Sequence, residues 1–207
     1  MTDSWIRQLA ERLGPADSDP ELPVDLRRAA VLMLLYQEKG DFRMPLIERP
    51  RGQGVHGGQF ALPGGAYDPA DDTLKTTALR EAWEEVAVDP GAVEMLGRLP
   101  PVQVRVSGFV VVPFVGWSPA MPRLYPHDAE VERIIHMPIA MLRDADSVAE
   151  VPAPAGSSHA TMFEYHLPEG KVWGATARML VSLGVVLREL PALNELGGQF
   201  RVQLGEG

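Results

Sequence analysis

The stretch "ALREAWEEVAV", Ala78 to Val88, mixes acidic residues with alanine, valine and tryptophan. At ~100° per residue in a helix, three carboxylates fall within one arc of about 100°: Glu81, Glu84 and Glu85. The larger apolar side chains fall on the opposite side, at about 140° to 200°: Leu79, Trp83 and Val86. The pattern predicts a helix with one acidic face and one apolar face, with Trp83 in the core.

The acidic face lies in the last two turns of this predicted helix. Negative charge there is unfavourable by ~0.3–1 kcal/mol per residue because of the helix dipole, and the three glutamates also repel one another. Arg80 lies beside them, but one guanidinium does not balance three carboxylates. A hard divalent cation would, because Mg²⁺ prefers carboxylate oxygens and retained waters. The spacing therefore favours a metal site over a solvated acidic face.

Composition limits the class of protein. The 207 residues, 45% hydrophobic and 23% charged, predict a single globular domain over residues 1–207. The absence of cysteine excludes disulfides and thiolate chemistry and favours a cytoplasmic location. The longest apolar runs are shorter than the ~20 residues of a membrane span, and the net charge of −9 disfavours nucleic acid as a partner. The sequence leaves monomer and homodimer open.

Apolar patterning and turn residues predict the order of elements. Helices are expected at about 3–13, 72–86 and 175–190. Strands are expected at "AAVLMLLYQ", "MPLIERP", "AVEMLGRLPPV", "FVVVPFVGW" and "VERIIHMP", with a further hairpin at "TMFEYHLPEGKVW". A loop with six glycines in fifteen residues, "RGQGVHGGQFALPGG", precedes the acidic helix. This mixture favours an α/β or α+β sandwich.

With the glycine turn and the acidic spacing established, the segment "GAYDPADDTLKTTALREAWEEVAV" resembles the Nudix box of the Nudix hydrolase superfamily. The matching residues are Gly65, Arg80, Glu81, Ala82, Glu84, Glu85 and Val88. Asp71 stands where the box has its first glutamate, eight residues rather than seven separate it from Arg80, and Ala87 replaces the final glycine.

These departures are similar to the variant in the coenzyme A pyrophosphatase branch. The upstream stretch "RPRGQGVHGGQFALPGG" matches that branch's signature at Arg49, His56, Gly58, Gln59 and Pro63 to Gly65. It departs at Gly54, where an arginine is usual, and at Leu62, where phenylalanine is usual. Downstream, "LPPV", "SGFVVVPFVG" and "VWGATA" also resemble the branch, so the similarity extends from about residue 44 to residue 190.

The resemblance implies an α/β/α sandwich with a mixed sheet. It implies hydrolysis of the coenzyme A diphosphate to 3′,5′-ADP and 4′-phosphopantetheine with Mg²⁺ or Mn²⁺, because cations stabilise charge on phosphoryl oxygens. Gly54 and Leu62 keep open a hydrolase of another nucleoside diphosphate derivative, such as a nucleotide sugar or a nucleoside polyphosphate. A binding module without hydrolysis is disfavoured, since every acidic position of "REAWEE" is present.

The resemblance also assigns roles. Glu81, Glu84 and Glu85 are expected as metal ligands and catalytic residues, and Arg80 is expected to orient them by ion pairing. The general base is one of these glutamates or, equally, Glu130 or Glu132 in the loop "HDAEVERII". For Glu130 and Glu132, an exposed acidic loop without a catalytic role is the slightly favoured alternative. Asp71 is interpreted as a helix N-cap rather than a catalytic residue.

The expected substrate-binding residues are Arg49, His56, Gly64 and Gly65. Arg51 is interpreted either as a second phosphate contact or as a surface arginine, and His56 either as a substrate contact or as a brace for its loop. Trp173 is expected at a buried strand end rather than stacked on a base.

Overall fold

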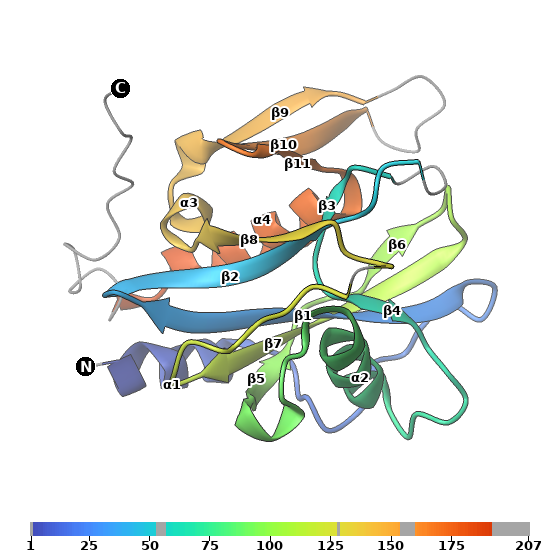
Figure 1. Cartoon of the computed structure of the whole chain (residues 1–207), viewed down its shortest axis with the longest axis horizontal. Coiled ribbons are helices and arrows are strands. Elements are labelled where there is room, and N and C mark those ends of the chain that lie inside the picture. The colour runs from blue at the N-terminus through green and yellow to red at the C-terminus, as the bar shows by residue number, and fades with distance from the viewer. Residues whose placement is uncertain (1, 53–56, 128, 154–159, 192–207) are drawn as a thin grey trace.

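The structure, a computed structural model, describes residues 2–52, 57–127, 129–153 and 160–191. Its centre is an eight-stranded sheet (Figure 1). The strands are β1 (Arg27–Glu38), β2 (Asp41–Glu48), β3 (Phe60–Ala61), β4 (Gly64–Ala66), β5 (Glu94–Arg98), β6 (Val102–Val104), β7 (Phe109–Ser118) and β8 (Arg133–Pro138). β1 and β7 pair in parallel, whereas the other pairs are antiparallel, so the sheet is mixed as expected.

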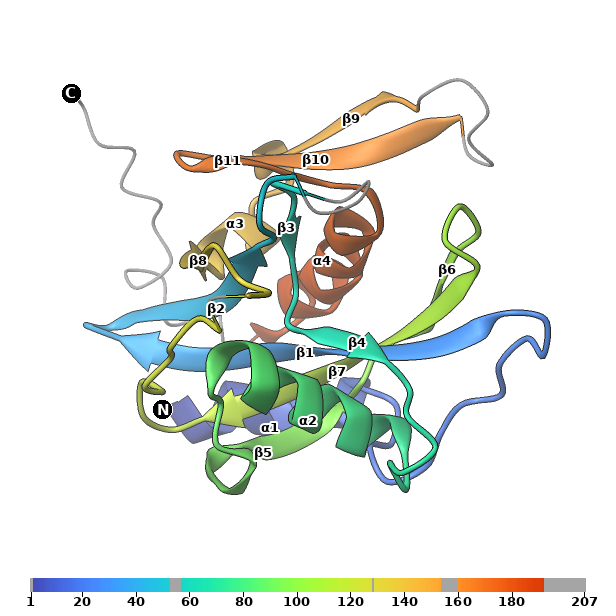
Figure 2. The same ribbon diagram turned by 45° about the vertical axis from the view of Figure 1, so that its right-hand side comes forward.

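Strand β1 is buried on both faces, and its side chains alternate between two apolar cores because successive residues of a strand point to opposite sides. One core contains Ala30, Leu32, Leu34 and Tyr36 together with residues of α2 (Leu74–Val86). The other contains Val31, Met33 and Leu35 together with residues of α1 (Thr2–Arg12) and α4 (Gly174–Arg188). Helices therefore cover both faces of the sheet (Figure 2), and the predicted α/β/α sandwich is confirmed.

A second, three-stranded antiparallel sheet lies beside α4 and β3 (Figure 1). It consists of β9 (Val148–Pro152), β10 (Thr161–Leu167) and β11 (Gly170–Trp173). The short helices are α3 (Ala140–Arg143), η2 (Pro90–Ala92) and η3 (Ala145–Ser147). The hairpin predicted from "TMFEYHLPEGKVW" is β10 and β11.

The two terminal helices occur where the sequence predicts them, at Thr2–Arg12 and Gly174–Arg188. α1 inserts Trp5 and Leu9 fully into the core. Within the described ranges, no helix is long and apolar enough to cross a bilayer.

The buried face of α2 differs from the predicted one. Ala78 and Ala82 are fully buried against the sheet, Glu85 is only 3% exposed, and Trp83 is 54% exposed. The prediction that Trp83 lies in the core, opposite the carboxylates, is therefore wrong. Small alanines face β1 and β4, against which the helix packs, and this orientation turns Glu85 inward and Trp83 outward.

Candidate active site

Two glycines allow α2 to lie close to the sheet. Gly64 has φ +150°, and a Cβ there would lie 2.3 Å from the carbonyl oxygen of Ala30. A Cβ on Gly65 would lie 2.5 Å from the carboxyl carbon of Glu81. Because neither residue has a side chain, β4 pairs with β1 on one side and accommodates a carboxylate of α2 on the other.

Both ends of α2 are fixed by hydrogen bonds. Thr73 is the N-cap, and its hydroxyl accepts the amide of Thr76 at 3.2 Å. At the other end, the carbonyl oxygens of Glu85 and Val86 accept amides from the loop at residues 119–132, at 2.9 and 3.1 Å. The last turn of the helix therefore holds this loop beside the acidic residues.

Glu85 is the most enclosed of the three glutamates. Its Oε2 accepts the backbone amide of Gly64 at 2.8 Å. Burial raises the pKa of Glu85 to about 7, although the Gly64 amide and the charge of Arg49 act in the opposite direction. The negative charges of Glu81 and Glu130 also contribute to this raised value. Glu85 is thus a carboxylate whose ionisation the surrounding protein opposes.

Glu81 is partly buried and lies against Gly65. Burial raises the pKa of Glu81, while Arg80 lowers it by a hydrogen bond and by its charge. Glu84 and Glu130 both raise this pKa electrostatically. Burial thus raises the pKa of both Glu81 and Glu85, and the charge of Glu81 also raises that of Glu85, which is the electrostatic condition that a bound cation would relieve.

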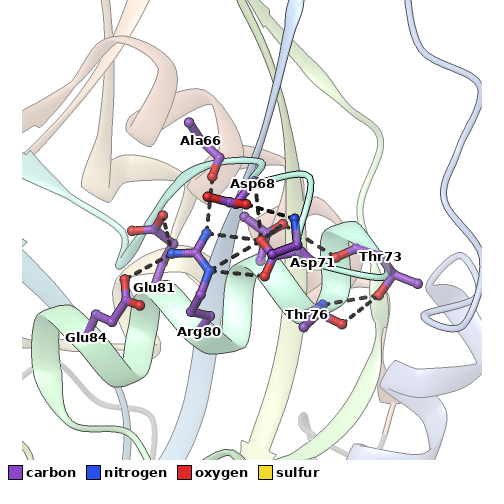
Figure 3. A network of polar contacts seen from close by, with 10 residues as sticks. Ala66, Asp68, Asp71, Thr73, Thr76, Arg80, Glu81 and Glu84 are labelled. Carbon is purple, nitrogen blue, oxygen red and sulfur yellow. Dashed lines mark hydrogen bonds and ion pairs between the residues drawn. The ribbon is translucent and has the colours of Figure 1, made fainter.

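Arg80 joins the carboxylates to the preceding loop (Figure 3). Its Nη1 donates to Glu81 and to Glu84, both at 2.9 Å, and its Nη2 donates to the carbonyl oxygen of Ala66 at 3.3 Å. Nε and Nη2 donate to Asp71 at 3.1 and 3.0 Å. Hydrogen bonding to Asp71 is the largest of the interactions that raise the pKa of Arg80. The guanidinium therefore holds three carboxylates at once.

The interpretation of Asp71 as a helix N-cap is wrong, because Thr73 caps α2. Asp71 is only 5% exposed and accepts hydrogen bonds from Arg80 and, at 2.8 Å, from Thr77. Burial alone would raise the pKa of Asp71, but these hydrogen bonds and one from the Asp68 amide hold it below its usual value. The sequence signal for the true N-cap is the motif "TLKT", which starts at Thr73, two residues after Asp71.

The donor set suits a hard divalent ion, although only part of it converges. Glu81 and Glu85 lie against Gly65 and Gly64 of β4, whereas Glu84 is exposed and paired with Arg80. Across the residues that the structure describes, no three acidic or histidine side chains form a ready-made metal cluster. Carboxylates whose pKa values the surrounding protein raises nevertheless match the ligand preference of Mg²⁺ or Mn²⁺ for oxygen.

The loop before β3 begins at Arg49, directly after β2. The amide of Arg49 donates to Gln59 at 3.0 Å, and its carbonyl accepts from Gly58 at 2.8 Å. The charge of Arg49 lowers the pKa of Glu85. His56 lies outside the described residues. The sequence reading missed Glu48, a buried carboxylate whose only signal is its place at the end of an apolar run.

The other residues singled out in the sequence are Glu130, Glu132 and Trp173, and they differ in exposure and contacts. Glu130 is exposed, and its charge raises the pKa of both Glu81 and Glu85. Glu132 is also exposed, and its amide donates to the carbonyl oxygen of Glu48 at 2.8 Å. Trp173 ends β11 and is partly buried.

Comparison with known proteins identifies the family. A family model described as the NUDIX domain matches residues 26–155. An uncharacterised Nudix hydrolase, NudL, from Cronobacter sakazakii is 34% identical over 165 residues, covering 80% of this chain and 85% of that protein. NudL from Salmonella paratyphi B is 39% identical over 169 residues, covering 76% and 86%. A MutT/nudix family structure from Enterococcus faecalis, 15% identical, shares the fold with a TM-score of 0.50 over 93% of this chain and 78% of that one. The chain is therefore an enzyme of the Nudix hydrolase family.

Proposed function

We propose that this enzyme hydrolyses the diphosphate bond of coenzyme A or its derivatives, yielding 3′,5′-ADP and 4′-phosphopantetheine. The observation that carries the hydrolytic part is the pair Glu81 and Glu85, which lie against the two glycines of β4 with raised pKa values. The coenzyme A part is supported by the loop residues that match that branch: Arg49, Gly58, Gln59 and Pro63 to Gly65.

Nudix hydrolases generally use divalent cations and act on small nucleotide substrates. We propose Mg²⁺ or Mn²⁺ here, with Glu81 and Glu85 as principal ligands and Glu84 as a third. When bound, such an ion neutralises phosphoryl oxygens and acidifies the attacking water. Arg80 keeps Glu81 and Glu84 oriented, and a Glu84 ligand would share its carboxylate with this guanidinium.

The protein groups supply positioning and proton transfer. Arg49 lies near Glu85 and is our candidate for binding the diphosphate, since guanidinium groups bind phosphate well. His56, Gly64 and Gly65 remain proposed substrate contacts. Glu130 is our candidate general base among the loop acids, because its charge acts on both enclosed carboxylates, and a general base must reach the attacking water.

We also propose that residues 1–207 form one domain, which is supported by the packing of α1 and α4 in the same apolar core. A cytoplasmic location is proposed from the lack of cysteine. The proposed partner is the small-molecule substrate, without nucleic acid or membrane, and the sequence leaves a homodimer open.

The test is product identification after incubation with coenzyme A and Mg²⁺ or Mn²⁺. We expect 3′,5′-ADP and 4′-phosphopantetheine, metal-dependent turnover, and a loss of at least about 100-fold in kcat for Glu81→Gln and Glu85→Gln. Absence of 3′,5′-ADP with both metals would reject the proposed substrate.

A second candidate keeps the chemistry and changes the substrate. Gly54 lacks the charge of the arginine usual in the coenzyme A branch, and Leu62 fills a buried position where phenylalanine is usual. A panel of nucleotide sugars and nucleoside polyphosphates decides this, because the preferred substrate should give the highest kcat/KM. A non-hydrolysing binding module would bind a ligand equally well before and after Glu85→Gln without turnover in either protein.

A further inference from the structure

A buried carboxylate lies at the end of β2, next to the proposed active site. Glu48 is 3% exposed, and its Oε2 accepts a hydrogen bond from Nε of Arg133. Its Oε1 lies 3.6 Å from Nη2 of Arg51. A buried carboxylate requires compensating charge, and these two arginines supply it to Glu48.

The two arginines are held very differently. Arg133 bonds Glu48, donates to the carbonyl oxygen of Glu169 at 3.3 Å and lies 5.7 Å from the Phe60 ring centroid. The Arg51 side chain is 83% exposed, and its separation from Glu48 exceeds a normal hydrogen bond. Arg133 is therefore a structural residue, whereas Arg51 presents its guanidinium to solvent.

The side chain of Arg51 is nevertheless directed. Its stem lies over Gly58, where an added Cβ would be 3.4 Å from Cγ of Arg51. Gly58 has φ +74° and is bonded through its amide to the carbonyl oxygen of Arg49. The glycine loop and Glu48 thus orient the guanidinium, which reduces the entropy lost when it binds a ligand.

The distance of Arg51 from the proposed site of hydrolysis limits which group of a bound substrate it can contact. The amide of His127 donates to the carbonyl oxygen of Glu85 at 2.9 Å, and the amide of Glu132 donates to the carbonyl oxygen of Glu48 at 2.8 Å. The end of β2, and Arg49 directly after it, therefore lie beside the last turn of α2, where the diphosphate of the proposed substrate would bind. Two residues of chain span at most about 7 Å, which places Arg51 within reach of the next group along a bound nucleotide.

We propose that Arg51 forms a subsite for a phosphate monoester that lies outside the diphosphate undergoing hydrolysis. This proposal rests on the proposed function, in which that group is the 3′-phosphate of coenzyme A. A guanidinium binds a phosphate through two parallel hydrogen bonds and keeps its charge at all physiological pH values. The subsite would distinguish 3′-phosphorylated nucleotides from those without this group.

Binding of product-like ligands tests the subsite without turnover. Calorimetry with 3′,5′-ADP and with 5′-AMP should show at least tenfold tighter binding of 3′,5′-ADP to the wild-type protein. Arg51→Ala should reduce that preference to under threefold while leaving the affinity for 5′-AMP unchanged. Arg105→Ala removes another exposed arginine, on the β6–β7 turn, and should preserve the full preference.

Three results would overturn the subsite. The wild-type protein could bind 3′,5′-ADP and 5′-AMP with equal affinity, Arg51→Ala could weaken the binding of both ligands equally, or Arg51→Ala could keep the full preference for 3′,5′-ADP. Retained binding of 5′-AMP shows that the variant is folded. Kinetics provide a second measurement, in which Arg51→Ala should raise KM about tenfold for coenzyme A but not for dephospho-coenzyme A, with kcat unchanged. Lack of hydrolysis of both compounds would reject the proposed function, while the binding comparison would still decide the subsite.

Discussion

Arg80 is the residue on which the geometry of the acidic side chains depends. It contacts Asp71 on the loop side and Glu81 and Glu84 on the helix side. Asp71 is buried and replaces, with a shorter side chain, the first glutamate of the Nudix box. We infer that the shorter acid is tolerated because the main chain before α2 brings its carboxylate to Arg80.

Replacement of Asp71 by asparagine tests this dependence. The variant keeps the size of the side chain but removes the charge that pairs with Arg80, so the guanidinium should orient Glu81 and Glu84 less well. We expect kcat/KM to fall roughly 10–100-fold, as for other residues that orient metal ligands. The measurement is kcat/KM from steady-state kinetics over a range of Mg²⁺ concentrations, and the control is Asp72→Asn, which changes an exposed aspartate. Equal activity of the two variants would contradict the role of Asp71.

The raised pKa of Glu85 predicts a pH dependence of stability in the metal-free protein. Its pKa rises from 4.5 to about 7 on folding, so its stabilising contribution is complete below pH 4.5 and is lost as the pH rises through about 7. Melting temperatures in a chelator should therefore fall between pH 5 and pH 8. Glu85→Gln should flatten this decline, and exposed Glu94→Gln should not. If the melting temperature of Glu85→Gln fell just as steeply with pH, other titrating groups would be the cause of the decline.

Single residues also show where reading the sequence succeeds. The spacing of Glu81, Glu84 and Glu85 correctly placed them on one side of α2, because i, i+3 and i+4 neighbours share a helix face. Trp83 lies outside the core, so hydrophobicity alone does not select the buried face of α2. Close packing of alanines and the hydrogen bond from Gly64 to Glu85 select it instead, and neither is visible in a helical wheel.

At the scale of elements, the junction of β4 and α2 positions the carboxylates. Gly64 and Gly65 are adjacent, but their surroundings predict opposite consequences of adding a methyl group. The Cβ at Gly64 meets backbone atoms of β1, whereas the Cβ at Gly65 meets the flexible end of Glu81.

Gly65→Ala should therefore give a folded protein with low activity, because Glu81 must leave its position. We expect roughly 10–100-fold lower kcat with stability within about 1 kcal/mol of wild type. Gly64→Ala should lose at least about 2 kcal/mol, since the φ of +150° and the 2.3 Å approach to Ala30 both penalise alanine. Urea denaturation and activity assays separate the two effects. A stable, active Gly65→Ala protein would show that Glu81 is not fixed by this contact.

Elements with a strong apolar pattern were predictable. β1, β7, α4 and the β10–β11 hairpin occur where the sequence indicated them, because long apolar runs and turn residues specify them locally. The parallel pairing of β1 with β7 and the insertion of β4 beside β1 depend on contacts between distant segments. The spacing in the sequence contains no signal for such contacts, so the resemblance predicted a mixed sheet but the strand order was not predicted.

For the molecule as a whole, enclosing carboxylates at the edge of a sandwich has a cost that a ligand can offset. The chain has a net charge of −9, and the sandwich places Glu81 and Glu85 where burial raises their pKa values. A cation that binds the folded state but not the unfolded chain would offset this repulsion and shift the folding equilibrium.

Mg²⁺ should therefore raise the melting temperature of the wild-type protein through these two residues. At a free concentration about 100 times its Kd, a single bound ion contributes about 2.7 kcal/mol, or roughly 5–10 °C for a chain of this size. Each protein is compared with its own melt in chelator, because removing the glutamates also stabilises the metal-free fold. The double variant Glu81→Gln, Glu85→Gln should lose the metal-dependent increase, while exposed Glu94→Gln should keep it. Sodium chloride of equal ionic strength controls for general screening of the −9 charge. An equal increase in the double variant would mean that Mg²⁺ stabilises the protein from another site.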